Sequence, residues 1–240
     1  MIENYYIKQY RHFLQLERSL AENSVEAYLH DIHKFNQFLD VKNHSVGVKD
    51  VTKVHIIDFL EFLNEWHFSA HSQARMISGL KSFFKFLIGE DVITEDPMEL
   101  IEGPKLGRKL PDTLSYEEIE QIIQTIDMST PEGTRNRAIL ELLYSSGLRV
   151  SELVNLQMGD LLLDVGFLRV IGKGNKQRLV PIGKTAIKYI DLYCKEVRVL
   201  QPKQEGEGHI LFLNRRGHRL TRVMIFTIIK NQTALSGIKR

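Results

Sequence analysis

Cysteine is almost absent from this sequence, in which Cys194 stands alone among 240 residues. A single thiol excludes an internal disulfide, and scarce cysteine is typical of a reducing compartment. Long apolar runs are missing too, since no stretch approaches the roughly 20 residues that span a bilayer. The opening segment, MIENYYIKQYRHF, lacks the apolar core of a secretory signal. We therefore expect a cytoplasmic protein.

Clusters of metal-ligating residues are also missing. Nine histidines are scattered along the chain, and although His30 and His33 share a helical spacing, no cysteine or carboxylate cluster joins them. Neither the Gly-x-Ser-x-Gly element of many hydrolases nor a dinucleotide-binding fingerprint occurs. We expect no metal and no cofactor.

Charge is present but unevenly divided. Residues 1–110 hold 13 Lys or Arg and 16 Asp or Glu, whereas residues 111–240 hold 19 and 14. Two stretches, 165–190 and 208–240, contain bases and no acids. Such segments suit a polyanion such as nucleic acid, although a solvated basic face explains the charge alone equally well.

Helical periodicity dominates the first hundred residues. Apolar residues recur at spacings of three and four in four or five segments, and no convincing strand interrupts them. Asn23 and Glu26 have the spacing of a capping box, and Thr52 is a further candidate N-cap. The pattern predicts a small helical bundle.

A proline-rich stretch separates this bundle from the rest. Residues 95–115 contain three prolines, two glycines and no sustained periodicity, which is typical of a linker. We expect a helical domain over residues 1–102, a linker over 103–112 and a second domain over 113–240.

The second part mixes helices with strands. Ser115 and Glu118 form a capping box for its first helix. Two β-type runs, 167–171 and 178–182, flank a turn containing Gly and Asn, which predicts a hairpin. A short strand is expected over 210–213. The predicted fold class is mainly α with a small β component.

The first candidate for chemistry is an arginine between two helices, in the run Gly147-Leu148-Arg149-Val150-Ser151-Glu152. The guanidinium fork of Arg149 can bind two phosphate oxygens, and Glu152 is close enough in sequence to orient it. A purely structural Arg–Glu pair between helices explains these residues more simply when they are taken alone.

The second candidate is the turn of the predicted hairpin. Its glycines allow close approach to a ligand, with Lys173 at the tip and Lys176 and Arg178 behind it. A basic tip of this kind can contact DNA phosphates, although plain surface turns are common.

The third candidate is an arginine-rich stretch, 214–222, that leads into a helix for which Thr221 is the expected cap. A solvated loop is the alternative. Three basic turns in one domain, after a helical domain, together favour nucleic acid binding over surface charge alone.

These motifs give the chain a resemblance to tyrosine recombinases of the Xer type, within the phage integrase family. Residues 147–153 resemble the family's first catalytic box, and residues 172–181 resemble its catalytic β-hairpin. Residues 20–24, with Tyr28 and Asp31 following, are similar to its N-terminal helical signature, as is the run 69–87. The resemblance implies a SAM-like core-binding helical bundle followed by a mixed α/β catalytic domain.

The resemblance also implies a reaction. Such enzymes attack a DNA backbone phosphate with a tyrosine hydroxyl, which gives a 3′-phosphotyrosyl link and a free 5′-hydroxyl without a metal or ATP. Arg149 matches the arginine that neutralises the transition state, and Lys173 matches the general acid for the leaving oxygen. Glu152 matches the acid that supports the arginine.

The chain departs from the family pattern in what should follow. The family continues with a His-x-x-Arg box and a tyrosine nucleophile, yet no histidine here has an arginine three residues on, and Tyr193 is the last tyrosine. We expect a truncated chain or a fragment that binds DNA without cutting it.

Both domains are expected to grip a double-stranded recombination site, in a homo- or heterotetramer with a like recombinase; the chain alone should be monomeric. The candidate DNA contacts are Gln73, Arg75, Lys81, Lys176, Arg178, Arg215, Arg219 and Arg222.

Chromosome dimer resolution is the usual role of Xer-type enzymes, but phage and transposon integrases share these motifs. Three further alternatives stay open: a non-catalytic DNA-binding accessory protein, a type IB topoisomerase, and a helical protein-interaction module with incidental charge.

Overall fold

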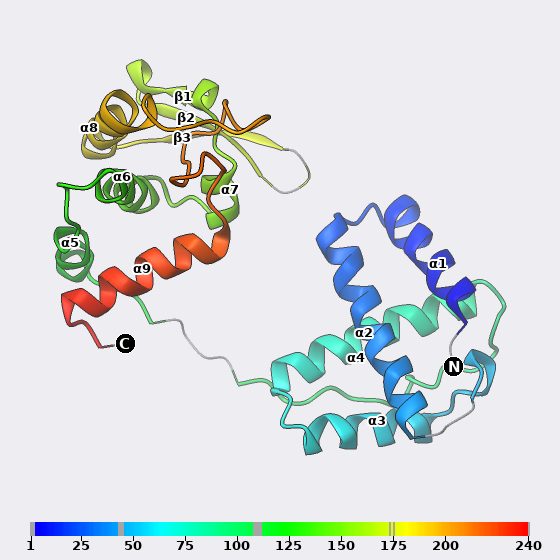
Figure 1. Cartoon of the computed structure of the whole chain (residues 1–240). Coiled ribbons are helices and arrows are strands. Elements are labelled where there is room, and N and C mark those ends of the chain that lie inside the picture. The colour runs from blue at the N-terminus through cyan, green and yellow to red at the C-terminus, as the bar shows by residue number, and fades with distance from the viewer. Residues whose placement is uncertain (1–2, 43–45, 108–111, 173, 175, 240) are drawn as a thin grey trace. The chain divides into compact units, whose positions relative to one another are not determined.

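The computed structural model describes every residue except 1–2, 43–45, 108–111, 173, 175 and 240 (Figure 1). The chain divides into two compact units, residues 1–110 and 111–240. No helix in the described part combines the length and apolarity that a membrane crossing requires.

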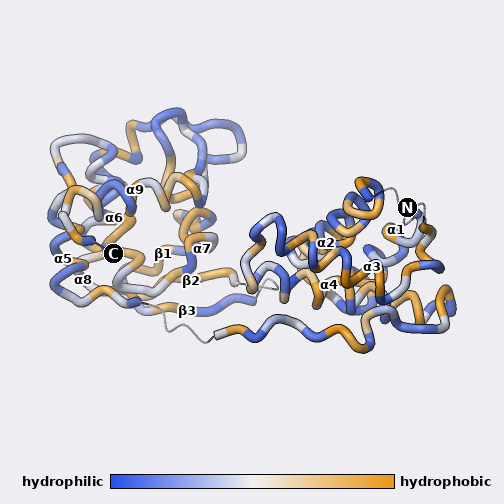
Figure 2. The backbone as a smooth tube through the Cα atoms, turned by 90° about the horizontal axis from the view of Figure 1, so that it is seen from below, coloured by the Kyte–Doolittle hydropathy of each residue, from blue (hydrophilic) through white to orange (hydrophobic). Residues whose placement is uncertain are grey.

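The first unit contains helices and no strand among its described residues. Its α-helices are α1 (Asn4–His12), α2 (Glu22–Val41), α3 (Lys53–Glu65) and α4 (Ala70–Gly89). Helices α2 and α4 pack against each other, and hydrophobic and hydrophilic stretches alternate along them (Figure 2). This is the amphipathic pattern that a small bundle buries.

Aromatic side chains form the centre of this bundle. Phe35 and Phe38 of α2 meet Phe59 of α3 and Phe84 of α4, and all four are fully buried. The rings of Phe35 and Phe59 lie 5.2 Å apart at an interplanar angle of 69°, an edge-to-face arrangement that aromatic pairs prefer.

The second unit surrounds one small sheet with helices. Its elements are α5 (Tyr116–Gln124), α6 (Pro131–Ser146), α7 (Val150–Val154), β1 (Leu161–Leu162), β2 (Phe167–Ile171), β3 (Gln177–Pro181), α8 (Lys184–Leu192) and α9 (Arg222–Ser236). The strands run antiparallel in the order β1-β2-β3, and Arg169 lies opposite Leu179 in the hairpin. Leu168 and Val170 of β2 point into the core with residues of α6 and α8.

These elements confirm the predicted fold class, mainly α with a small β component. The hairpin forms where expected, and Ser115 and Glu118 make both hydrogen bonds of a capping box, at 3.3 and 2.7 Å. Thr52 caps α3, with His55 rather than an acid as its partner.

Two local predictions were wrong. Asn23 is not a cap, because α2 already begins at Glu22 and its N-cap is Ala21. Residues 210–213 make only isolated bridges, Ile210 with Gln157 and Leu213 with Arg219. The buried guanidinium of Arg198 donates to the carbonyls of Ile210 and Leu211, so these acceptors are satisfied without a neighbouring strand.

Candidate active site

Arg149 lies where the chain turns from α6 into α7. Gly147 ends α6 in the left-handed conformation (φ +59°), which a glycine adopts without strain. Leu148 is then buried, and Arg149 becomes the N-cap residue of α7. Its side chain is 74% exposed and donates through Nη1 to Glu152 Oε1 at 3.1 Å. The guanidinium is thus held on one side and open to a ligand on the other.

Glu152 is the centre of the site. Its side chain is only 4% exposed, yet it accepts four hydrogen bonds. Two come from the backbone N–H and the guanidinium of Arg149, and two come from Nη1 and Nη2 of Arg178, at 2.8 and 2.9 Å. The hydrogen bonds from Arg178, followed by those from Arg149, lower the pKa of Glu152 to about 2 against the opposing effect of burial.

The ion pair between Arg178 and Glu152 connects the β2–β3 hairpin to α7. Arg178 lies on β3, and the backbone N–H of Gly172 closes the hairpin by donating to Lys176 O at 2.8 Å. A Cβ atom at Gly172 would lie 3.1 Å from Arg178 Nη1 and 3.6 Å from Glu152 Oε1. The glycine therefore leaves room for the ion pair beside the hairpin turn. Lys173, the predicted general acid, lies outside the described residues.

The arginine-rich stretch 214–222 is tied to the same region. Arg219 donates to Glu207 at 3.0 Å and to Asn155, the residue that ends α7, at 2.8 Å. Close by, Leu211 N–H donates to Leu156 O at 2.9 Å. The structure thus places this stretch beside α7, whose N-cap residue is Arg149.

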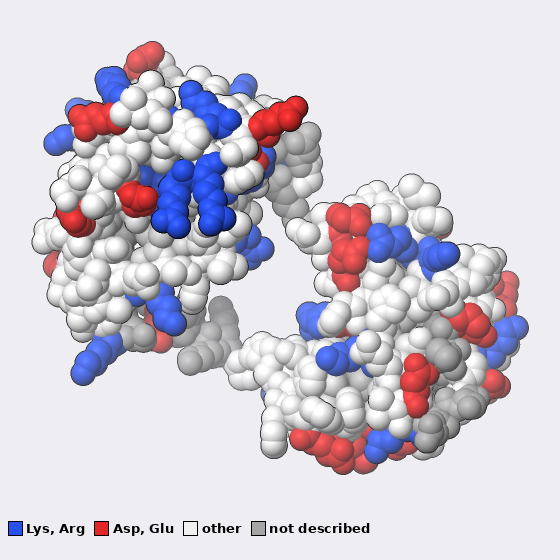
Figure 3. All heavy atoms as spheres, in the orientation of Figure 1, with Lys and Arg blue, Asp and Glu red and all other residues white. Residues whose placement is uncertain are grey.

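The remaining predicted contacts of the second unit are exposed. Lys176 follows the hairpin turn, Arg222 opens α9, and Arg215 lines a cavity of about 380 Å³ together with the buried Arg135. Figure 3 shows several Lys and Arg side chains lying close together on one face of this unit.

The predicted contacts of the first unit all lie on α4. The Gln73 amide donates to Asn64 Oδ1 and Phe68 O, at 2.8 and 2.9 Å, which holds its side chain against the bundle. Arg75 pairs with the buried Asp31, and Lys81 lines a cavity of about 750 Å³.

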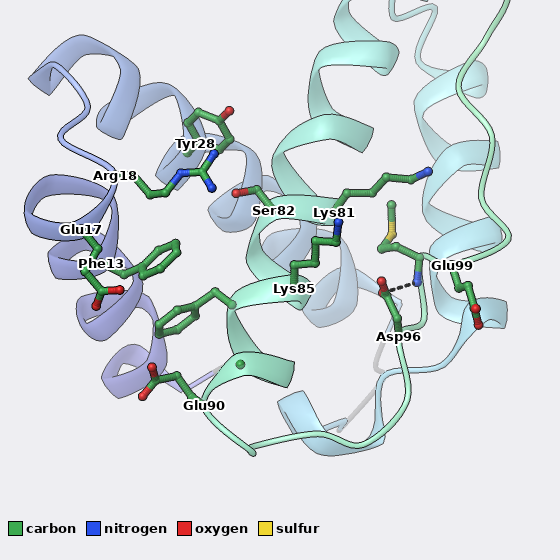
Figure 4. A pocket seen from close by; sticks show the side chains of 13 residues that line it. Phe13, Glu17, Arg18, Tyr28, Lys81, Ser82, Lys85, Glu90, Asp96 and Glu99 are labelled. Atoms are coloured by element: carbon green, nitrogen blue, oxygen red, sulfur yellow. Dashed lines mark hydrogen bonds between the residues drawn. The ribbon is translucent and has the colours of Figure 1, made fainter.

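Two further basic residues line this cavity that the sequence did not single out, Arg18 and Lys85 (Figure 4). Lys85 follows Lys81 by one helical turn, so helical spacing was a usable signal for it. Arg18 lies 63 residues before Lys81 in the sequence, and no spacing rule joins them. Carboxylates line the cavity as well: Glu17, Glu90, Asp96 and Glu99.

A metal site is not apparent in the described part of the chain. There, no three or more His, Cys, Asp or Glu residues are grouped so that they could hold an ion.

Both units match known protein families. Residues 112–240 match the phage integrase family, and residues 7–91 match the N-terminal SAM-like domain of phage integrases. The chain is 38% identical over 234 residues to tyrosine recombinase XerD of Listeria monocytogenes, which covers 98% of this chain and 79% of the relative.

Solved structures share the fold. A lambda integrase dimer bound to a COC′ core site superposes with a TM-score of 0.74 at 20% identity, covering all of this chain and 80% of that one. XerH recombinase in a post-cleavage complex with palindromic difH substrate gives 0.73 at 22% identity, covering 98% and 69%. The matches to family models, the 38% identity to XerD and the shared fold all indicate the same family. The chain belongs to the phage integrase family and is a tyrosine recombinase of the Xer type, an enzyme of site-specific DNA recombination.

Proposed function

We propose that Arg149, Lys173 and Glu152 form the phosphate-binding part of the recombinase active site. The observation that carries the proposal is the exposed Arg149 guanidinium, held by a buried carboxylate that stays ionised. A fixed cation facing open space is suited to a phosphate that gains negative charge during attack. In a site closed by DNA, such a contact contributes several kcal/mol to the transition state.

Each residue has a separate part in this reaction. Arg149 binds the non-bridging phosphate oxygens and stabilises the phosphorane-like transition state. Lys173, which follows Gly172 in the sequence, donates a proton to the leaving 5′-oxygen. Glu152 keeps Arg149 oriented and joins it to the hairpin through Arg178.

The DNA ligand is a double-stranded recombination site, bound through both units. The predicted contacts stay as proposed: Gln73, Arg75, Lys81, Lys176, Arg178, Arg215, Arg219 and Arg222. Arg178 has the further part of holding Glu152. Because most of these are cations suited to phosphates, affinity should fall steeply with salt.

The 240 residues as they stand should bind DNA without forming a covalent adduct. They contain no His-x-x-Arg box, and the last tyrosine, Tyr193, is fully buried, with its hydroxyl bonded to Gln201 and to the backbone of Leu213. The test is a nicked duplex that traps covalent products. No phosphotyrosyl band is expected, and a band would contradict this.

The cellular role that we propose is chromosome dimer resolution in the cytoplasm, by a homo- or heterotetramer with a like recombinase on DNA. The name XerD of its relatives supports this assignment. Deleting the gene should raise the fraction of cells with joined chromosomes. An unchanged fraction would instead favour a role in a phage or transposon.

Direct binding tests the proposed site. Duplexes selected from a random library are bound by the wild type and by Arg149→Ala, with fluorescence anisotropy as the readout. Arg169→Ala is the matched control, because Arg169 also pairs with a buried carboxylate, Asp160, and is not a predicted contact. We expect Arg149→Ala to weaken binding and the control to leave it unchanged. Equal effects of the two variants would overturn the assignment.

A further inference from the structure

Another buried carboxylate, Asp31, lies between two helices of the first unit. Asp31 of α2 is 2% exposed, and its Oδ2 accepts a hydrogen bond from Arg75 Nη1 of α4 at 2.7 Å. Its Oδ1 lies 2.6 Å from the same nitrogen but accepts no well-directed hydrogen bond. One nitrogen of Arg75 thus lies close to both oxygens and donates a hydrogen bond to Oδ2.

The packing of α4 makes room for this carboxylate. A Cβ atom at Gly79 would lie 2.7 Å from Asp31 Oδ2 and 3.1 Å from Asp31 Cβ, closer than such atoms approach. Gly79 is itself buried, so no larger side chain fits while the carboxylate occupies this position. A glycine inside a helix lowers the stability of that helix. We therefore ask what the buried carboxylate contributes in return.

The ion pair between Asp31 and Arg75 is not well suited to stabilising the fold. Burial raises the pKa of Asp31, although the charge and the hydrogen bond of Arg75 oppose the rise. The ionised carboxylate is therefore less stable here than in water, even with its partner. Buried ion pairs often contribute little net stability.

The other nitrogens of Arg75 remain available. Apart from Asp31, the guanidinium makes one long contact, from Nη1 to Ala27 O at 3.5 Å, and among the described residues Nη2 and Nε donate to nothing. The side chain is 47% exposed. Ser82 and Lys85 follow Arg75 along α4 at a helical spacing that places them near its side of the helix, and both line the cavity of Figure 4.

We propose that Asp31 is a positioning residue for DNA binding, which holds one arm of the Arg75 guanidinium so that its free nitrogens donate to a DNA backbone phosphate. Gly79 provides the space that this requires. The inference rests on the proposed function, because it needs DNA on this face of α4.

The sign of one substitution separates positioning from simple charge. Asp31→Asn removes a negative charge, so electrostatics alone predicts tighter DNA binding. Positioning predicts the opposite, because Arg75 loses the charged acceptor that orients it and meets an NH₂ donor in place of one of the two oxygens. We expect the affinity of the full chain for a selected duplex to fall about tenfold, the scale of one charge-assisted hydrogen bond. Arg75→Ala should weaken binding as much, and the double variant should be no weaker than Arg75→Ala.

One measurement and two further variants accompany these affinities. Thermal unfolding checks that each variant is folded at the assay temperature. Gly79→Ala perturbs the same pair with both charges retained, so it tests the proposal even if Asp31→Asn does not fold, and it should also weaken binding. Asp160→Asn removes another buried carboxylate from an exposed arginine, Arg169, and should not weaken binding.

Each remaining outcome is decisive. If the wild type binds no DNA, the proposed function fails, and this inference fails with it. If Arg75→Ala weakens binding while folded Asp31→Asn or Gly79→Ala does not, the inference alone fails. An equal loss in Asp160→Asn would assign the effect to the fold. An unchanged salt slope in Arg75→Ala would contradict a phosphate contact, since one lost phosphate contact lowers the slope by about 0.9.

Discussion

Glu152 shows how a single buried residue joins two segments of the active site. Its carboxylate serves Arg149, three residues away, and Arg178, 26 residues away. With four hydrogen bonds in a nearly closed environment, the charge is well compensated. Removing it leaves two guanidinium groups without their common acceptor.

The low pKa of Glu152 predicts a pH dependence of stability. The folded-state pKa of about 2 lies below the ordinary value of 4.5, so the ionised form stabilises the fold above about pH 4.5. This stabilisation should be lost as pH falls toward 2, and its full size is about 3 kcal/mol. Glu152→Gln should lack this part of the pH dependence. Unfolding by guanidinium chloride at several pH values from 7 to 3 measures the free energy of unfolding of both proteins. The same pH dependence in the wild type and in Glu152→Gln would contradict the assignment.

Arg178 should not tolerate replacement by lysine. Lysine keeps the charge but cannot make the two parallel bonds to Glu152, at 2.8 and 2.9 Å. We expect Arg178→Lys to lower the free energy of unfolding by about 1–3 kcal/mol. Lys176→Ala, at an exposed position of the same hairpin, should stay within about 0.5 kcal/mol. The difference between the two variants in urea unfolding is the measurement; a Lys variant as stable as the wild type would refute the role.

The ion pairs of Arg149, Arg178 and Arg75 show which contacts can be predicted from sequence. Arg149 and Glu152 lie three residues apart, and their association could be anticipated from local spacing. The pairs Arg178–Glu152 and Arg75–Asp31 span 26 and 44 residues. Because no periodicity connects such positions, sequence analysis identified the arginines only as basic residues and gave them no partner.

At the scale of elements, turn chemistry was the most informative signal. Glycine, asparagine and capping residues predicted the hairpin and the start of α5, because these depend on local backbone preferences. The prediction of a strand over 210–213 was wrong. Its apolar run gave no sign that the buried Arg198 donates hydrogen bonds to the carbonyls of Ile210 and Leu211.

Gly217, the glycine of the arginine-rich stretch, should not tolerate replacement by alanine. Its φ is +85°, and a Cβ atom would lie 2.5 Å from Pro202 O, a backbone atom. Gly237 has a similar φ of +75° but open space around it. Gly237→Ala should therefore show only the strain of the left-handed conformation, about 1–2 kcal/mol. Gly217→Ala should lose more; chemical unfolding of both variants is the check, and equal losses would contradict the close approach.

At the scale of the whole molecule, the two units have separate hydrophobic cores. One cluster lies within residues 7–101, and the other lies within residues 122–225. Separate cores predict that each unit unfolds with its own stability. A substitution in one core should then leave the other unit unaffected.

Phe35→Ala tests this separation. The ring is fully buried in the first unit, and its loss should destabilise that unit by about 3–5 kcal/mol. Calorimetry of the full chain should show the transition of one unit shifting downward while the transition of the other stays in place. A single transition that shifts as a whole would show instead that the units unfold together.

The central claim is that Arg149, held by Glu152, contacts DNA phosphate. The most direct test is the salt dependence of DNA affinity for the wild type and Arg149→Ala, measured on the same selected duplex. The logarithm of the association constant should fall linearly with the logarithm of salt concentration, and the slope should be shallower by about 0.9 in the variant. A flat response in the wild type, or the same slope in both proteins, would contradict the claim.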